Sequence, residues 1–166
     1  MIDIRAMAVE DIDRILSLEA RTPEAPHWDR AAFERFLVEP DTEDVRHAAL
    51  VATHGHDLIG FAIARQVLDI CELESIVIAE NVRRMGIGKA LLRAVTTWCL
   101  AHGAVRIELE VRAGNEHAIR FYQKAGLIKE GLRRDYYRDP DDHAVLMGKG
   151  LDSGLWVVEN FPQKTD

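Results

Sequence analysis

Hydrophobic and polar residues alternate along the chain with two different periods, and each period predicts a different kind of element. Apolar side chains at helical spacing predict helices over residues 9–20, 29–37, 88–101 and 115–125. Alternating or continuous apolar runs predict strands over residues 2–5, 48–53, 58–67, 72–78, 106–112, 127–135 and 143–149. Helices and strands therefore succeed one another along most of the chain. This succession favours an α/β (α+β) fold with one mixed sheet flanked by helices.

Turn and cap residues separate these elements. Two prolines in segment 21–28 forbid a continuous helix there, and Asp29 is suited to cap the helix that follows. Trp28, after the proline break, is expected either to anchor the core or to form part of a substrate wall. The polar residues 54–57 lie between two apolar runs and predict a hairpin.

Length and charge limit the classes of protein that fit. At 166 residues and 48% hydrophobic content, the chain suits one domain over residues 1–150. The tail over residues 151–166 is apolar enough to pack on this domain or on a second subunit, and we expect a monomer or a weak homodimer. The net charge of −7 argues against a general nucleic-acid binder, which needs a basic face.

Several features favour a cytoplasmic protein. Cys71 and Cys99 fit no metal spacing and no disulfide framework, which favours a reducing compartment. Residues 1–5 do not resemble a signal peptide. The apolar run 58–64 is far shorter than the roughly 20 residues that cross a bilayer, so no membrane span is expected.

The centre of the chain reads as a strand, a short turn, a glycine loop and the start of a helix. Gly86 and Gly88 remove side chains where the backbone must approach something, and the free amides of a helix start can hold a phosphate. A P-loop is excluded, because Arg83 stands where its first glycine is required and Ala90 replaces its hydroxyl. Leu91 is too large for a dinucleotide fingerprint. An ordinary glycine turn before a helix remains the alternative.

Two residues are candidates for acid–base chemistry. Glu110 lies on the polar face of its strand beside Glu108, and like charges with partial burial raise a carboxylate pKa toward that of a general base. Tyr122 follows in the next helix, and a phenol stays protonated at neutral pH, so it can serve as a general acid. The alternatives are a solvated strand face for Glu110 and a core aromatic beside Ile119 for Tyr122.

Metal chemistry is not expected. His47, His54 and His56 lack a paired ligand pattern, and the last two fall in the predicted hairpin turn. We therefore predict no metal site.

Four segments carry a family resemblance: Val67-Leu68-Asp69; Arg84-Met85-Gly86-Ile87-Gly88-Lys89-Ala90-Leu91-Leu92; Leu109-Glu110-Val111-Arg112-Ala113-Gly114-Asn115 with Ala118-Ile119 and Phe121-Tyr122; and Arg133-Arg134-Asp135-Tyr136-Tyr137. The glycine loop resembles that of the Gcn5-related N-acetyltransferase superfamily. The last two segments resemble the bacterial ribosomal-protein-alanine N-acetyltransferase family. The match covers residues 58–149 well and 1–150 loosely. The chain departs from the family at Glu74, where an apolar residue is common, and at Leu127, where phenylalanine is usual.

The resemblance implies an acetyltransferase (GNAT-like) fold, a mostly antiparallel sheet of about seven strands with about four helices. It implies acetyl-CoA as the acetyl donor and the N-terminal amine of a protein as acceptor, an alanine of a ribosomal protein in the family. Glu110 becomes the general base and Tyr122 the general acid. The residues implied to hold acetyl-CoA are Ile76, Val77 and Ile78 through backbone groups, Arg84, Met85, Gly86, Ile87, Gly88 and Lys89 at the pyrophosphate, and Asn115.

The acceptor and the activity have alternatives. An α-amine with pKa about 8 is roughly 10% neutral at pH 7, whereas a lysine is below about 0.1%, so a carboxylate base suits an N-terminus better. An acetyltransferase for a small amine would need a closed acidic pocket instead of an open peptide groove. A non-catalytic acyl-CoA-binding module is a third reading, although its usual mark would be loss of Glu110 or Tyr122, and both are present.

Overall fold

The computed structural model describes residues 1–151 and contains one seven-stranded sheet. Its strands are β1 (Ile2–Ala6), β2 (Val45–His54), β3 (Asp57–Val67), β4 (Ile70–Ile78), β5 (Arg106–Arg112), β6 (Ile128–Tyr137) and β7 (Asp142–Gly150). Its helices are α1 (Ile12–Ala20), α2 (Arg30–Val38), α3 (Ile87–Ala101) and α4 (Glu116–Lys124), with short 3-10 turns η1 (Val9–Asp11) and η2 (Glu80–Val82).

The strands lie in the order β1-β2-β3-β4-β5-β7-β6. Among the described strands only β4 and β5 run parallel, because α3 carries the chain back between them. The other neighbouring pairs are antiparallel. The predicted mixed, mostly antiparallel sheet with four helices is therefore confirmed.

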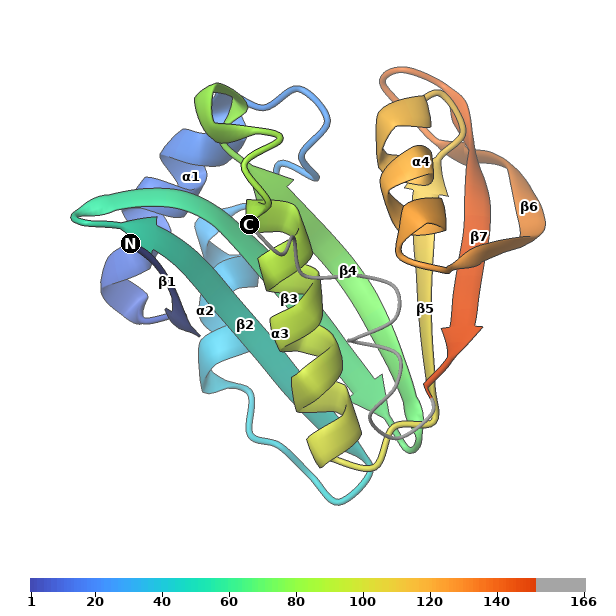
Figure 1. Ribbon diagram of the computed structural model, residues 1–166, viewed down its shortest axis with the longest axis horizontal. Helices are drawn as coiled ribbons and strands as arrows, with labels where there is room; N and C mark the ends of the chain where they lie inside the picture. Colours follow the sequence, from blue (N-terminus) through green and yellow to red (C-terminus); the bar gives the residue numbers. More distant parts are fainter. Residues whose placement is uncertain (152–166) are drawn as a thin grey trace, which may run out of the picture.

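Two helices lie on each face of the sheet, but they cover different strands on the two faces (Figure 1). Helices α3 and α4 lie on one face, where their apolar sides share a core with the inward residues of β4, β5 and β7. On the opposite face α1 and α2 pack against β2 and β3 through a second apolar cluster. The polar face of β5 lies on this second side of the sheet, beyond the two helices. A cavity of about 740 Å³ lies on this face.

The sheet splits between β4 and β5. Residues of these strands pair only from Ile70↔Arg106 to Glu72↔Glu108, after which the strands diverge (Figure 1). In β4 the register against β3 passes from Leu73 to Ser75, so Glu74 is the extra residue of a β-bulge. Bulges bend a strand and sharpen its twist, which accounts for the divergence at this point. Beyond Glu72, β4 and β5 therefore share no hydrogen-bonded ladder.

Local signals in the sequence account for most element boundaries. The Asp29 carboxylate accepts from the Ala32 amide at 2.9 Å and caps α2, as predicted. The helix predicted over 9–20 begins instead as η1, because the buried Asp11 carboxylate accepts from the Ala8 amide and closes a separate turn there. That carboxylate is held by Arg5, which lowers its pKa from the usual range.

The expectation about the cysteines is wrong. Cys71 at the start of β4 and Cys99 in the last turns of α3 are joined as a disulfide, with their Cα atoms 6.2 Å apart. Both residues are fully buried in the core between helix and sheet. A separation of 28 residues gives no framework that can be read from spacing, because the pairing depends on how α3 crosses the sheet.

Within residues 1–151 no helix is long and apolar enough to cross a membrane. The predicted packing of the apolar tail falls outside the described residues.

Candidate functional site

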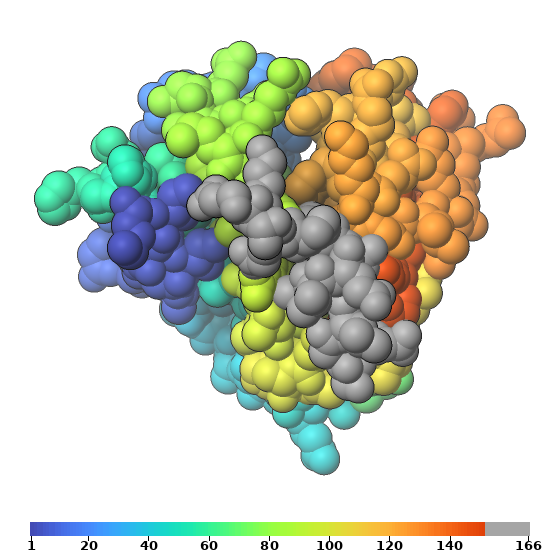
Figure 2. Space-filling view, in the orientation of Figure 1, coloured from blue at the N-terminus to red at the C-terminus, as the bar shows by residue number. Residues whose placement is uncertain are grey.

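The glycine loop (residues 84–89) forms the N-terminal end of α3. Gly86 has φ +83°, a left-handed conformation that costs a side-chain-bearing residue free energy. The first hydrogen bond within the helix runs from the Ala90 amide to the Gly86 carbonyl at 2.9 Å, so the amides between them belong to the open helix end. The loop lies at the molecular surface (Figure 2), and Met85 is 64% exposed. This geometry fits the predicted anion seat.

The two glycines have different roles. A Cβ at Gly86 would meet no other atom within 4 Å, so Gly86 serves backbone conformation. A Cβ at Gly88 would lie 3.5 Å from the Phe121 ring of α4, so Gly88 lies where α3 and α4 approach each other. The loop therefore lies between the two helices on the same face of the sheet.

The other residues predicted to hold acetyl-CoA lie near this end of the split. Ile76, Val77 and Ile78 pair with β3 on one side of β4, while the ladder to β5 has already ended at Glu72. Backbone groups on the second side of this segment are thus free of a strand partner, as the prediction requires. Asn115 lies at the start of α4, where its side-chain oxygen accepts from the Ala118 amide at 3.1 Å. Its carbonyl is therefore occupied in capping, and its amide group remains to contact a ligand.

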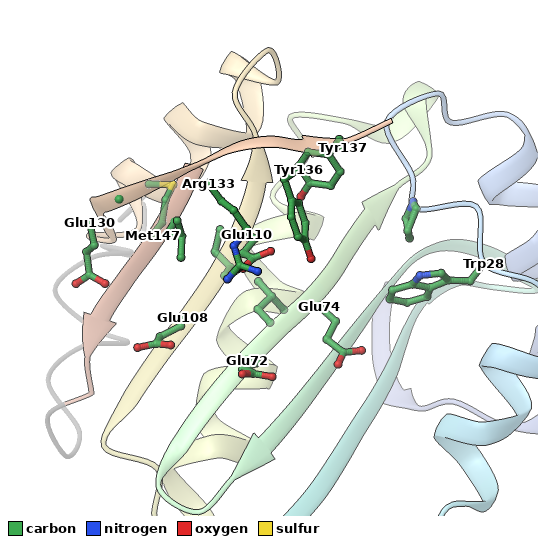
Figure 3. A pocket seen from close by; sticks show the side chains of 15 residues that line it. Trp28, Glu72, Glu74, Glu108, Glu110, Glu130, Arg133, Tyr136, Tyr137 and Met147 are labelled. Carbon is green, nitrogen blue, oxygen red and sulfur yellow. The ribbon is translucent and has the colours of Figure 1, made fainter. Parts of the chain in front are cut away.

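A cavity of about 740 Å³, which we call the acidic cleft, lies on the opposite face of the sheet (Figure 3). Five glutamates and one arginine are among the residues that line it. The lining residues are Pro26, Trp28, Glu72, Leu73, Glu74, Glu108, Leu109, Glu110, Glu130, Gly131, Arg133, Tyr136, Tyr137, Leu146 and Met147. They come from β4, β5, β6, β7 and the segment between α1 and α2, so the cleft spans the split.

Glu110 lies on the floor of the acidic cleft, on the polar face of β5 as predicted. Its carboxylate lies 2.9 Å from the Arg133 guanidinium of β6 and keeps 29% of its side-chain surface exposed. The guanidinium of Arg133 also lies 4.9 Å from the centre of the Tyr136 ring. Glu110 is thus accessible from the cleft and fixed in direction by an ion pair.

Tyr137 lies near both predicted catalytic residues, Glu110 and Tyr122. Burial raises the pKa of the Tyr137 phenol, and the nearby Glu110 carboxylate raises it further. The Arg112 guanidinium lies 4.3 Å above its ring and holds it in place. The Tyr137 phenol also lies close enough to raise the pKa of Tyr122. In the sequence, Tyr137 was only one of the residues that carry the family resemblance. Its position beside Glu110 depends on β6 lying outside β7, and the sequence gives no signal for that.

Tyr122 lies on the other face of the sheet. It is 8% exposed, belongs to the core under α4, and is not among the residues that line the acidic cleft. Burial raises its pKa well above the usual range, so its phenol holds its proton at neutral pH. Glu110 and Tyr122 therefore lie on opposite faces of the sheet.

The segment between α1 and α2 forms one wall of the acidic cleft. Trp28 lines the cleft and also packs against Phe33 and Phe36, with ring centroids 5.8 and 5.3 Å away. It therefore meets both roles considered for it from the sequence. Arg83, at the base of the glycine loop, donates to the Ile78 carbonyl at 3.4 Å and pairs with Glu24 at 3.3 Å. This arginine links the glycine loop to the cleft wall.

Glu19 of α1 lies beneath the same wall and was not predicted from the sequence. Its side chain is 2% exposed, and neither carboxylate oxygen has a hydrogen-bond partner in the described structure. Burial raises its pKa to about 7. The His27 ring and the amides of His27 and Trp28 lie close enough to offset part of this rise, although neither amide completes a hydrogen bond.

Among the residues that the structure describes, no group of three or more histidine, cysteine, aspartate or glutamate side chains is arranged to hold a metal ion.

The fold and the comparisons with known proteins identify the chain as an N-acetyltransferase. A model of the acetyltransferase (GNAT) family matches residues 9–127, and the chain belongs to this family, whose members use acetyl-CoA. A Salmonella typhimurium protein named ribosomal protein bS18-alanine N-acetyltransferase is 31% identical over 150 residues, which cover 87% of this chain and 94% of that protein. A Mycobacterium tuberculosis protein named N-alpha-acetyltransferase RimI is 33% identical over 159 residues, covering 92% and 94%.

A solved structure agrees with these relatives. The crystal structure of the ribosomal-protein-S18-alanine N-acetyltransferase from Escherichia coli superposes with a TM-score of 0.77 at 27% identity, covering 92% of this chain and 95% of that one. The resemblance stated from the sequence motifs is therefore confirmed, as is the enzyme class.

Proposed function

We propose that this protein transfers the acetyl group of acetyl-CoA to the N-terminal α-amine of a protein, with alanine as the first residue and a ribosomal protein as the acceptor. The observation that supports the proposal is that Glu110 and Tyr122 lie on opposite faces of the sheet. One carboxylate is open to an acceptor cleft, and one buried phenol is on the side of the glycine loop. The names of the relatives support the same activity.

The two residues divide the proton transfers of the reaction. Glu110, directly or through one water, takes a proton from the acceptor ammonium, and the neutral amine attacks the thioester carbonyl carbon. When the carbon–sulfur bond breaks, the thiolate takes a proton from Tyr122 and the nitrogen loses its second proton. Tyr122 is then reprotonated, and one proton is released to solvent overall.

Backbone groups and the glycine loop supply the remaining requirements. Backbone amides of Ile76, Val77 and Ile78 would stabilise the oxyanion and hold the pantetheine arm, and the end of the β4–β5 pairing at Glu72 supports this role. Arg84, Met85, Gly86, Ile87, Gly88 and Lys89 would hold the pyrophosphate, with Asn115 nearby. These contacts position the donor thioester over the split, where the amine can reach it from the acidic cleft.

A second acceptor class has one observation in its favour. Five carboxylates in one cleft suit a polyamine as well as a peptide. The preference for a peptide N-terminus rests on the relatives and on the larger neutral fraction of an α-amine at pH 7. We further propose that the protein acts in the cytoplasm, as a monomer or a weak homodimer.

Free-thiol release from acetyl-CoA tests the proposal with three acceptors. These are a basic peptide with a free N-terminal alanine, the same peptide N-blocked and carrying an internal lysine, and spermidine. We expect release with the free alanine peptide alone, and a loss of at least about 100-fold in Glu110→Gln. Glu43→Gln, on an exposed loop, is the matched charge control and should keep full activity.

The other outcomes lead to different conclusions. Release with spermidine alone would assign the protein to the small-amine class. Unchanged turnover in Glu110→Gln would remove Glu110 from the role of base. Acetyl-CoA binding without release to any acceptor would favour a non-catalytic binding module. Binding of acetyl-CoA by Glu110→Gln, measured by calorimetry, shows that the variant is folded.

A further inference from the structure

Glu74 differs from the other glutamates of the acidic cleft because it has no arginine partner. Within the described residues no ion pair or hydrogen bond to the Glu74 carboxylate is formed, whereas each of the other four is paired. The pairs are Glu72 with Arg65 at 3.9 Å, Glu108 with Arg106 at 2.7 Å, Glu110 with Arg133 at 2.9 Å, and Glu130 with Arg106. Glu74 is therefore the carboxylate whose charge the described chain leaves to be matched by a ligand.

A bulge in the backbone of β4 holds the Glu74 carboxylate at the point where β4 and β5 separate. Glu74 is the bulge residue of β4, and it comes two residues after Glu72, where β4 last pairs with β5. A bulge redirects the side chain that it carries, and bulges are frequent beside active sites. In Figure 3 the Glu74 side chain extends from β4 on the side of Trp28, away from β5, which carries Glu110.

Trp28 supplies an aromatic surface on that same side of the cleft. Its ring lines the cleft and is fixed from behind by Phe33 and Phe36. A carboxylate and a fixed aromatic ring that line the same cleft can together bind a guanidinium or ammonium group, by ion pairing and by cation–π attraction. A carboxylate, by contrast, repels an acidic side chain and gains no ion pair from an apolar one.

Nearby charged groups balance the negative charge of the Glu74 carboxylate only in part. Burial in the cleft raises its pKa, although more than a third of its surface stays open to the cleft. Arg65 and His47 act in the opposite direction, but Arg65 is already paired with Glu72, which raises the pKa of Glu74 further. A cation bound in the cleft would offset the free-energy cost of burying the Glu74 carboxylate and would weaken its repulsion from Glu72.

We propose that Glu74 and Trp28 bind a cationic side chain, arginine or lysine, within the first residues that follow the reacting amine of the acceptor. The inference rests on the proposed function and adds the charge of the acceptor to it. It makes Glu74 a specificity-determining residue, whereas Glu110 acts on the reacting nitrogen.

The reacting amine itself is a poor occupant for this position. That nitrogen must lose its proton before it attacks, and a second unpaired carboxylate beside it would favour the charged form. Glu110 and Tyr122 already flank the split, and Glu74 extends away from them toward the cleft wall. A side chain one or two residues further along the acceptor reaches that wall without disturbing the reacting centre.

The test compares peptides of equal length that begin with a free alanine. Arginine, glutamine or glutamate is placed at the second or the third position, and kcat/KM is measured for each with acetyl-CoA as donor. For the native protein we expect arginine to exceed glutamine about tenfold at one of these positions. In Glu74→Gln this ratio should fall to within about twofold, and in Glu74→Lys the glutamate peptide should become better than the arginine peptide.

Glu108→Gln is the matched control. It removes the same charge from the same cleft, but its carboxylate lies on β5 and is paired with Arg106, which keeps its contact with Glu130. This variant should retain the preference for arginine. Melting temperatures of the three variants within a few degrees of the native value show that the comparison is between folded proteins.

Three results would overturn the inference. The first is a native protein that acetylates all the peptides equally, and the second is an unchanged preference in Glu74→Gln. The third is an equal loss of kcat on every peptide in Glu74→Gln, because Glu74 would then act on the reacting amine. In each case the proposed function stands, whereas a native protein that acetylates no free alanine peptide would overturn the proposed function as well.

Discussion

The guanidinium of Arg133 lies 2.9 Å from the carboxylate of Glu110, although their strands are not neighbours. Arg133 is on β6, Glu110 is on β5, and β7 lies between the two strands. The ion pair therefore crosses one strand on the floor of the acidic cleft. It fixes the direction of the carboxylate that we propose as the general base, while leaving part of that carboxylate exposed to the cleft.

Arg133→Met should lower kcat/KM about tenfold to a hundredfold, because a displaced base loses its alignment with the acceptor nitrogen. Arg134→Met is the control, since Arg134 is the next residue on β6 and does not line the cleft. Steady-state kinetics with the free alanine peptide measures both variants. Equal effects of the two substitutions would mean that the loss reflects surface charge rather than the pair with Glu110.

Tyr122→Phe should lower kcat about 100-fold or more and leave acetyl-CoA binding nearly unchanged, because the substitution removes only the proton donor. The raised pKa of Tyr122 adds a second expectation. The phenol stays protonated across the range in which an acetyltransferase is assayed, so its ionisation should produce no fall of kcat up to about pH 10. A variant with normal kcat would remove Tyr122 from the mechanism.

The two glycines of the loop should respond differently to alanine. Gly86→Ala forces a side chain into a left-handed conformation and should destabilise the fold by about 1 kcal/mol, seen as a lower melting temperature. Gly88→Ala meets Phe121 only at ordinary contact distance, so its stability should change little. Its added methyl group should instead weaken acetyl-CoA binding, measured by calorimetry. The reverse pattern would contradict the assignment of the loop.

Glu19 should make stability fall as pH rises. Below pH 4.5 its carboxyl is protonated in both states, and between 4.5 and about 7 the unfolded chain ionises while the folded chain does not. The native protein therefore loses on the order of 3 kcal/mol of stability over this window, and above it the difference is constant. Glu19→Gln cannot ionise, so its melting temperature should fall less between pH 5 and 8 than that of the native protein.

Glu43→Gln is a suitable control for this measurement, because Glu43 is exposed and its replacement should leave the pH dependence unchanged. The comparison uses the slope with pH rather than the absolute melting temperature, since a buried glutamine amide has hydrogen-bonding needs of its own. Parallel slopes for Glu19→Gln and the native protein would show that Glu19 is ionised in the folded state throughout.

Local patterns in the sequence predicted the features that depend on few neighbours. The alternation over residues 106–112 predicted that Glu110 faces away from the core, and the cap at Asn115 predicted the start of α4. Helical spacing and the glycines predicted α3 and its loop. These features follow from a single strand, turn or helix, and each is present in the structure.

Features that depend on the register between distant segments were not predictable. The pair of Glu110 and Arg133 needs the position of β6 outside β7, and the bulge at Glu74 needs the alignment of β4 against β3. The disulfide of Cys71 and Cys99 needs the path of α3 across the sheet. A single sequence carries no direct signal for any of these arrangements. The catalytic and acetyl-CoA-binding roles of the predicted residues stay predictions that the variants above can test.

The two contacts of Arg83 have a consequence for the order of events on the enzyme. Because one side chain contacts the Ile78 carbonyl beside the split and Glu24 in the segment between α1 and α2, we expect it to couple donor binding to acceptor binding. The Glu24 pair is 34% and 48% exposed, so it can transmit no more than about 1 kcal/mol, a several-fold change in affinity. Coupling of this kind is reciprocal. An acceptor peptide should therefore tighten acetyl-CoA by the same modest factor by which acetyl-CoA tightens the peptide.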